Sequence, residues 1–394
     1  MPENRHNRLF ARLLRFVVLA FSMSGLPAES HAALIERKIF PSVTDPAITN
    51  GVPPTRHFVY LDDATPHPGK LFVFLAGTAG PPAAYTNILR TAAQIGYHSV
   101  GLVYPNELSI NEDICPGQPA TCPEDVRLEI VTGADTSPLV EVNRANCIEN
   151  RLIKLVQYLH QNFPTEGWTN FLTGGDLRWE LLAVAGHSQG GGHAAMIGKI
   201  HQVHRVAMFS STEPAAWTLE PLLTPPAQFA GFAHTLEDSF NGITLSWARF
   251  AVPGPLTNVD ASAPPFDGSR RLATTAIPRD GSNYHGCVVV DSATPLQADG
   301  VTPLFRDHWI YMIGPAGSGP DPLPVTPSIA GTNLTLNWPS MPGEQFAVER
   351  RPNLSMNEDW TLLTSNLFAP SFSQTHVVSN ALSTNTGFFR VRRK

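Results

Sequence analysis

The sequence is poor in charged residues and has no surplus of positive charge. Only 15% of its 394 residues are charged, and 27 lysines and arginines stand against 33 aspartates and glutamates, a formal net charge of −6. A protein that binds a nucleic-acid backbone needs clustered cations to neutralise the phosphates. We therefore expect no nucleic acid among its partners. Since 42% of the residues are hydrophobic, we expect a sizeable buried core.

Cofactor and metal motifs are also missing. The chain has no phosphate-binding P-loop, no H-E-x-x-H motif and no dinucleotide-binding glycine motif between a strand and a helix. Its histidines are scattered and do not share one helix face at ligand spacing. The sequence thus predicts a protein that uses no cofactor and no metal.

Long apolar runs are absent as well. A membrane-spanning helix needs about 20 apolar residues, and the run that begins at Phe16 is shorter and is broken by Gly25 and Pro27. Arginines precede this run, and the small residues Ser30 and Ala32 follow it. The pattern predicts an export signal over residues 1–32 and a secreted or periplasmic protein without a membrane span after cleavage.

Cysteine occurs only four times, at Cys115, Cys122, Cys147 and Cys287. In an oxidising compartment, the near pair Cys115 and Cys122 could close a small disulfide in a Pro- and Gly-containing loop. Four cysteines allow three pairings, and the sequence does not choose among them. No C-x-x-C spacing suggests zinc, so we favour a structural disulfide.

Strand-like and helix-like runs alternate through residues 33–314. The strand-like runs, rich in β-branched and aromatic residues, cover 56–61, 70–75, 98–104, 181–185, 205–209, 229–234 and 272–277. Helical periodicity marks residues 82–97, 144–163, 190–201 and 305–313. This alternation predicts an α/β fold, a mostly parallel sheet with helices on both faces. Residues 106–143 show no period and are expected to form an insertion that acts as a wall or lid.

The C-terminal part has a different pattern. Residues 315–327 are dense in glycine and proline and are expected to form a linker. Residues 328–394 contain only short, closely spaced strand-like runs, which predict a small all-β domain. This tail resembles the fibronectin type III-like β-sandwich modules of secreted enzymes. Its Trp338, Trp360 and Phe388 could form a docking surface or the core of the sandwich.

The motif Gly186-His187-Ser188-Gln189-Gly190 carries the strongest chemical signal. It lies directly between a predicted strand and a predicted helix, where a sharp turn would present the serine at the end of the sheet. Flanking glycines relieve crowding in such a turn, and the free N–H groups of the helix would point at the same spot. The motif therefore predicts Ser188 as a nucleophile, with His187 more suited to packing than to acting as a base.

With this motif, residues 55–314 resemble the α/β-hydrolase family. The resemblance implies a triad in the order nucleophile, acid, histidine. Asp238, after the strand-like run at 229–234, is our choice of acid. Glu237 is the alternate and Glu213 a third candidate. His285, in the loop after the last predicted strand, is the expected base, in preference to His308.

The resemblance also implies an oxyanion hole with two N–H donors. One is expected from the backbone of Gln189. The other is expected from the glycine-rich loop at 76–81, where Thr78 is our choice.

The predicted function is that of a secreted serine hydrolase, which cleaves small or polymeric carboxylic esters through an acyl-enzyme. One alternative is a non-catalytic relative that binds a ligand. Another is an esterase directed to a polymer, with the tail as its docking module. The sequence makes no prediction of the oligomeric state.

Overall fold

The structure is a computed structural model that describes residues 34–51, 54–65, 67, 69–260, 262–314, 325–340, 345–351, 360–369, 373–381 and 387–393. The expected export signal at 1–32 and most of the expected linker lie outside these residues. Within them, no helix combines the length and the apolar character that a membrane crossing requires.

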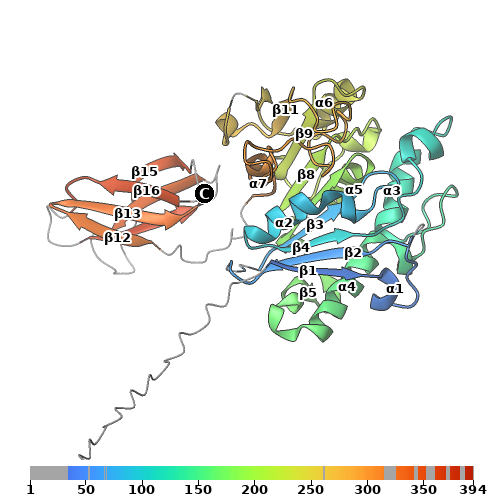
Figure 1. The fold of residues 1–394 in the computed structure, drawn as a ribbon, viewed down its shortest axis with the longest axis horizontal. Helices are drawn as coiled ribbons and strands as arrows, with labels where there is room; N and C mark the ends of the chain where they lie inside the picture. The colour runs from blue at the N-terminus through green and yellow to red at the C-terminus, as the bar shows by residue number, and fades with distance from the viewer. Residues whose placement is uncertain are drawn as a thin grey trace, which may run out of the picture. The chain divides into compact units, whose positions relative to one another are not determined.

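A nine-stranded sheet forms the centre of the part before residue 315, in the order β1-β2-β4-β3-β7-β8-β9-β11-β10 (Figure 1). Neighbouring strands are parallel from β4 to β10, and only the β1–β2 and β2–β4 pairs are antiparallel. This confirms the expected α/β class with a mostly parallel sheet. The strands are β1 (Leu34–Ile39), β2 (His57–Asp62), β3 (Leu71–Leu75), β4 (His98–Leu102), β7 (Leu182–His187), β8 (Arg205–Phe209), β9 (Phe229–His234), β10 (Leu256–Asn258) and β11 (Arg271–Thr274).

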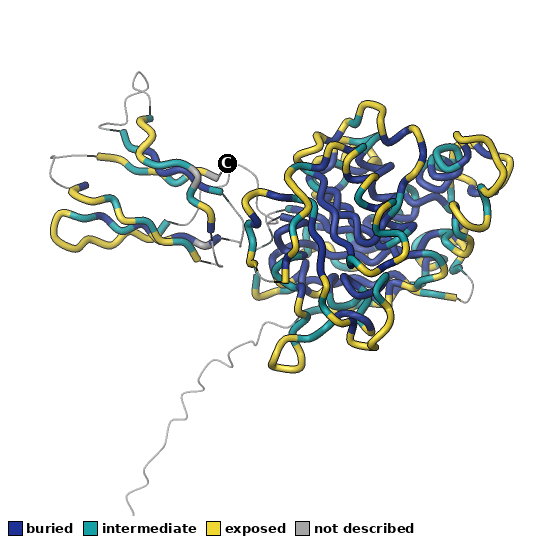
Figure 2. The backbone as a smooth tube through the Cα atoms, turned by 90° about the horizontal axis from the view of Figure 1, so that it is seen from above, coloured by how far each residue is buried: buried dark blue, intermediate teal, exposed yellow. Residues whose placement is uncertain are grey.

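Helices pack on both faces of this sheet. Side chains of β3 alternate between two cores: Leu71, Val73 and Leu75 face one, and Phe72 and Phe74 face the other. Because both faces are covered, all five residues of β3 are buried, and its sequence is a continuous apolar run. Figure 2 shows the centre of this part of the chain in dark blue, the colour of buried residues.

The helices divide between these two cores. On the face of Phe72 lie α2 (Thr86–Gln94) and α7 (Arg306–Ile313). On the face of Leu71 lie α3 (Cys122–Thr132), α4 (Ile148–Asn162), α5 (Gln189–Ile200) and α6 (Phe240–Arg249). The short helix α1 (Pro41–Thr44), the hairpin of β5 (Leu172–Thr173) and β6 (Asp176–Leu177), and several 3-10 helical turns also belong to this part.

The sequence did not predict β1, β5, β6, β10, α1 or α6, and it also missed helix α3. It lies inside the insertion at 106–143, after a single π-helical turn at Ile110–Ile114. Its buried residues include Arg127 and Glu129 as well as apolar side chains. Because polar residues occupy inward positions, no apolar periodicity marks the helix.

The part after residue 325 consists of two three-stranded antiparallel sheets, in the orders β12-β13-β16 and β15-β14-β17. Both sheets contribute to one small core, with Leu336 and Trp338 from β13 and Phe346 and Val348 from β14. The expected all-β character is confirmed, and Trp338 is a core residue, so it is not available for docking. The strands are β12 (Thr326–Ala330), β13 (Asn333–Pro339), β14 (Gln345–Arg351), β15 (Thr361–Phe368), β16 (Ser373–Val378) and β17 (Phe388–Arg393).

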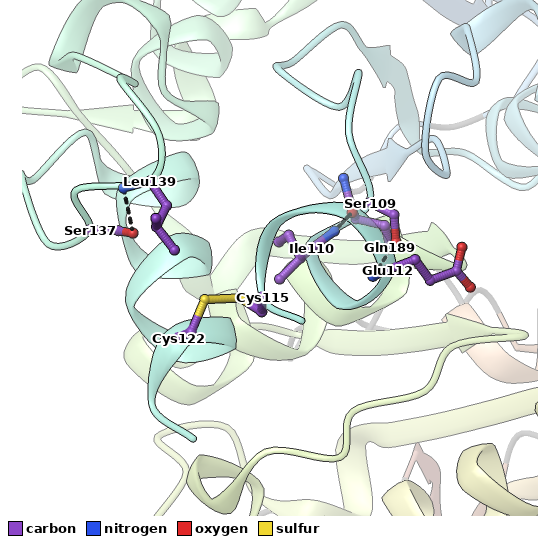
Figure 3. The surroundings of a disulfide bond; sticks show 8 residues. All are labelled: Ser109, Ile110, Glu112, Cys115, Cys122, Ser137, Leu139 and Gln189. Atoms are coloured by element: carbon purple, nitrogen blue, oxygen red, sulfur yellow. Dashed lines mark hydrogen bonds between the residues drawn. A yellow bond between two sulfur atoms is a disulfide. The ribbon is translucent and has the colours of Figure 1, made fainter. Parts of the chain in front are cut away.

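A disulfide joins Cys115 to Cys122, with 5.8 Å between the Cα atoms (Figure 3). It ties the turn at Ile110–Ile114 to the start of α3. Of the three pairings that the sequence left open, the structure contains the candidate near pair. Cys147 and Cys287 are buried free thiols.

The cysteine arrangement predicts a thiol count. Iodoacetamide should add two labels to the denatured, unreduced protein, at Cys147 and Cys287, and four labels after reduction. Mass spectrometry of the labelled peptides gives the count. Four labels without reduction would contradict the disulfide.

Candidate functional site

The site lies where the direction of the sheet connections reverses. The chain passes from β3 to β4 on one side and from β7 to β8 on the other, while β3 and β7 are parallel neighbours. In open α/β sheets the carboxyl ends of two such strands frame a binding crevice. The segments that follow β3 and β7 meet here: a Cβ added to Gly77 would lie 3.2 Å from the Cβ of Ser188.

Ser188 occupies a sharp turn between β7 and α5. Its backbone has φ 53° and ψ −122°, a region that non-glycine residues rarely adopt. The Ser188 N–H donates to the Phe209 carbonyl at 2.8 Å, and the Gly191 N–H donates to the Ser188 carbonyl at 3.0 Å. These bonds fix the strand–turn–helix geometry that the sequence motif predicts.

The motif glycines are required by close backbone contacts. A Cβ on Gly186 would lie 2.2 Å from the carbonyl carbon of Gly190, and a Cβ on Gly190 would lie 2.1 Å from the Leu75 oxygen. Neither distance leaves room for a side chain. The turn therefore folds tightly on itself and against the end of β3 because both positions are glycine.

His285 binds a buried carboxylate. Its Nδ1 lies 2.7 Å from Glu237 Oε2, and the Glu237 side chain is 1% exposed. Glu237 Oε1 also accepts hydrogen bonds from Ser210 Oγ at 2.9 Å and from the His234 N–H at 3.0 Å. Because the carboxylate accepts, Nδ1 carries the proton, and Nε2 of the neutral ring is left as an acceptor.

This contact corrects the choice of Asp238 as the acid beside His285. Asp238 is exposed and follows Glu237 in the turn after β9, and the two side chains have different surroundings. Glu213, the third candidate, is buried and bound to Arg127, whose Nε donates to Glu213 Oε2 at 3.0 Å. His308 is half-buried on α7, with its ring stacked on Phe232.

His187 links three segments of the site. Its Nε2 lies 2.9 Å from the His285 carbonyl oxygen, which can only accept, so Nε2 carries the proton. Its Nδ1 therefore accepts from the Tyr85 hydroxyl at 3.0 Å, and the Tyr85 oxygen accepts from the Gly77 N–H at 3.2 Å. The sequence predicted the packing role of His187 but not its partner Tyr85.

Both side chains in this link stay uncharged. Burial, with the nearby His285 acting in the same direction, lowers the pKa of His187 from 6.5 to about 3. Burial raises the pKa of Tyr85 to about 12. The contribution of neutral His187 to stability is therefore full above pH 6.5 and is lost as the pH falls toward about 3.

The backbone N–H groups of Thr78 and Gln189, two of the cleft-lining residues, have no hydrogen-bond acceptor among the described residues. In the loop after β3 the neighbouring donors are engaged: Gly77 N–H with Tyr85, Ala79 N–H with the Asn106 carbonyl at 2.7 Å, and Gly80 N–H with the Gly77 carbonyl. Gln189 is the first residue of α5, where helix N–H groups lack internal partners.

Two residues of the insertion donate hydrogen bonds to Gln189. The Ile110 N–H donates to Gln189 Oε1 at 2.8 Å (Figure 3), and Arg127 Nη1 donates to the Gln189 carbonyl at 3.1 Å. The segment from Ser109 to Glu112 also lines the cleft. The insertion therefore forms one wall of the cleft and is hydrogen-bonded to Gln189.

Ser188, His285, Glu237, Thr78 and Gln189 all line one cleft of about 470 Å³. The Ser188 hydroxyl forms no hydrogen bond within the described part of the chain, so it is open to a bound molecule. No group of three or more His, Cys, Asp or Glu residues in that part could hold a metal ion. A serine that shares a cleft with a carboxylate-bound imidazole is suited to nucleophilic chemistry at a carbonyl.

Comparison with known proteins gives no family assignment: no protein family model matches the chain, and no curated protein is significantly similar in sequence.

The link through Tyr85 predicts a stability effect. Tyr85→Phe leaves the His187 Nδ1 and the Gly77 N–H buried without partners, which should lower the free energy of unfolding by about 1–3 kcal/mol. Urea unfolding measures this change. Tyr158→Phe is the control, since that hydroxyl forms no hydrogen bond with any residue that the structure describes, and it should change the free energy of unfolding by less than about 0.5 kcal/mol. Equal stability of the two variants would show that the link contributes nothing.

Proposed function

We propose that the protein is a serine hydrolase of the α/β-hydrolase type that cleaves carboxylic esters with a triad of Ser188, His285 and Glu237. The observation that carries this proposal is the shared cleft, in which a serine on a strained strand-to-helix turn lies with a histidine bound to a buried carboxylate. The chain order serine, acid, histidine is that of the α/β-hydrolases.

In the proposed reaction, His285 Nε2 takes the proton from Ser188 Oγ as the oxygen attacks the ester carbonyl. The tetrahedral oxyanion receives hydrogen bonds from the backbone N–H groups of Gln189 and Thr78. The intermediate collapses to an acyl-enzyme, and the alcohol leaves with the proton from His285. Water then attacks by the same route and releases the acid.

Glu237 has two roles in this scheme. Its bond to Nδ1 keeps the imidazole in the tautomer whose Nε2 can accept the serine proton, and its charge stabilises the imidazolium that forms. The hydrogen bonds from Ser210 and His234 support the ionised carboxylate in its buried position.

We further propose that the protein works outside the cytoplasm, as its N-terminal sequence indicates. The disulfide between Cys115 and Cys122 supports this proposal, because disulfides persist mainly in oxidising compartments. A docking role of the C-terminal part on a polymeric substrate stays a proposal. It would have to use exposed residues such as Phe388 instead of the buried Trp338.

The proposed nucleophile predicts covalent labelling. A fluorophosphonate probe should add one label to the native protein, at Ser188, and none to Ser188→Ala. Ser292→Ala, which changes an exposed serine that does not line the cleft, should label like the native protein. Labelling of Ser188→Ala to the native extent would rule out this nucleophile.

The proposed acid predicts unequal effects of neighbouring carboxylates. Glu237→Gln should lower kcat on a chromogenic acetate ester by about 10³–10⁴-fold, because the amide favours the wrong tautomer of His285. Asp238→Asn removes only an exposed charge and should change the rate by no more than about fivefold. Circular dichroism checks that both variants fold. A larger loss of kcat in Asp238→Asn than in Glu237→Gln would contradict this assignment and would make Asp238 the acid of the triad.

A further inference from the structure

The cleft around Ser188 has an unusually polar lining for a small-molecule site. Binding pockets are mostly lined by apolar and aromatic side chains. Here only Leu236 and Tyr284 present large apolar surfaces, and the other lining residues carry hydroxyl, amide, carboxylate, guanidinium or imidazole groups. A long alkyl chain bound in this cleft would cover these groups without satisfying them, at a cost for each one left unpaired.

One of these polar groups already lacks a partner. Gln189 lines the cleft and is 7% exposed, and its Nε2 is buried without a hydrogen bond among the described residues. Its Oε1 is engaged by Ile110, so the orientation of the amide is fixed. This unpaired amide adds to the polar character of the cleft wall.

The charges of the cleft are unbalanced. Arg127 is the one lysine or arginine among the residues that line this cleft, and it forms an ion pair with buried Glu213. Glu237 is bound to His285. Glu112 and Asp238 also line the cleft, are exposed, and form no ion pair within the described residues. The negative charges of these two carboxylates are thus left to interact with a bound substrate.

We propose that this cleft selects hydrophilic esters with a short acyl group and no negative charge, such as an acetylated polyhydroxy compound or a cationic acetate. This inference rests on the proposed function. Hydroxyl and amide groups of the lining bind the polar part of the substrate, and Glu112 and Asp238 repel anionic esters. Both residues act on specificity, and neither takes part in the bond-breaking step.

The first test is acyl length. Each methylene buried in an apolar channel would add about 0.8 kcal/mol, which is about fourfold in kcat/KM. We expect no such rise from p-nitrophenyl acetate through butyrate to octanoate, with acetate hydrolysed at least as well as the others. A steep increase toward octanoate would overturn the inference while leaving the proposed function intact.

The second test is charge. Three thioacetates whose thiol part carries a trimethylammonium, a hydroxyl or a carboxylate group can be compared by the thiol they release. We expect kcat/KM to be lowest for the carboxylate. Glu112→Gln and Asp238→Asn should each narrow the cation-to-anion ratio of kcat/KM by about threefold, as for exposed charge pairs. Glu141→Gln, which removes an exposed charge of the insertion outside the cleft lining, is the matched control and should keep the native ratio.

The outcomes separate the two claims. A preference for the anionic thioester, or an unchanged ratio in both cleft variants, would contradict the inference alone. If no ester or thioester is hydrolysed and the fluorophosphonate probe does not label Ser188, the proposed function fails and the inference fails with it.

Discussion

The tight turn at Ser188 is the constraint on which the rest of the site depends. A non-glycine residue at positive φ is strained and persists only where the surroundings hold it. Gly186 and Gly190 allow the turn to fold against itself and against the end of β3. Substituting either glycine would push α5 away from the sheet, and Ser188 and the Gln189 N–H would move with it.

A network of neutral and charged groups surrounds this turn. His187, adjacent to the serine, ties the loop of His285 to the loop after β3 through Tyr85. Its low pKa keeps positive charge away from His285, and among the described residues Glu237 is the carboxylate that forms an ion pair with the proposed base. The insertion holds Gln189 from the other side. Loops from four parts of the chain are therefore fixed relative to one another by hydrogen bonds as well as by packing.

The local parts of this arrangement could be predicted from sequence. The glycine motif, the apolar strand before it and the amphipathic face of α4, with Leu152, Leu155 and Leu159 buried, depend on neighbours in the chain. These features mark the α/β class and the position of Ser188 without any tertiary information.

Other parts depend on contacts between distant segments. Glu237 and Asp238 are adjacent acidic residues, so the sequence alone does not show which of them is the acid. The path of the turn after β9 decides which carboxylate reaches His285. Helix α3 was missed because its inward Arg127 pairs with Glu213, a residue 86 positions away. The Tyr85–His187 bond spans 102 positions and leaves no signature in either local sequence.

The most direct test of the account is to trap its covalent intermediate. The protein is mixed rapidly with a chromogenic acetate ester, quenched in acid within the first turnover and digested for mass spectrometry. The account predicts an acetyl group on the peptide that contains Ser188, formed in step with the released chromophore and absent from Ser188→Ala. Chromophore release at the native rate without an acetyl group on Ser188, or with the acetyl group on another residue, would contradict it.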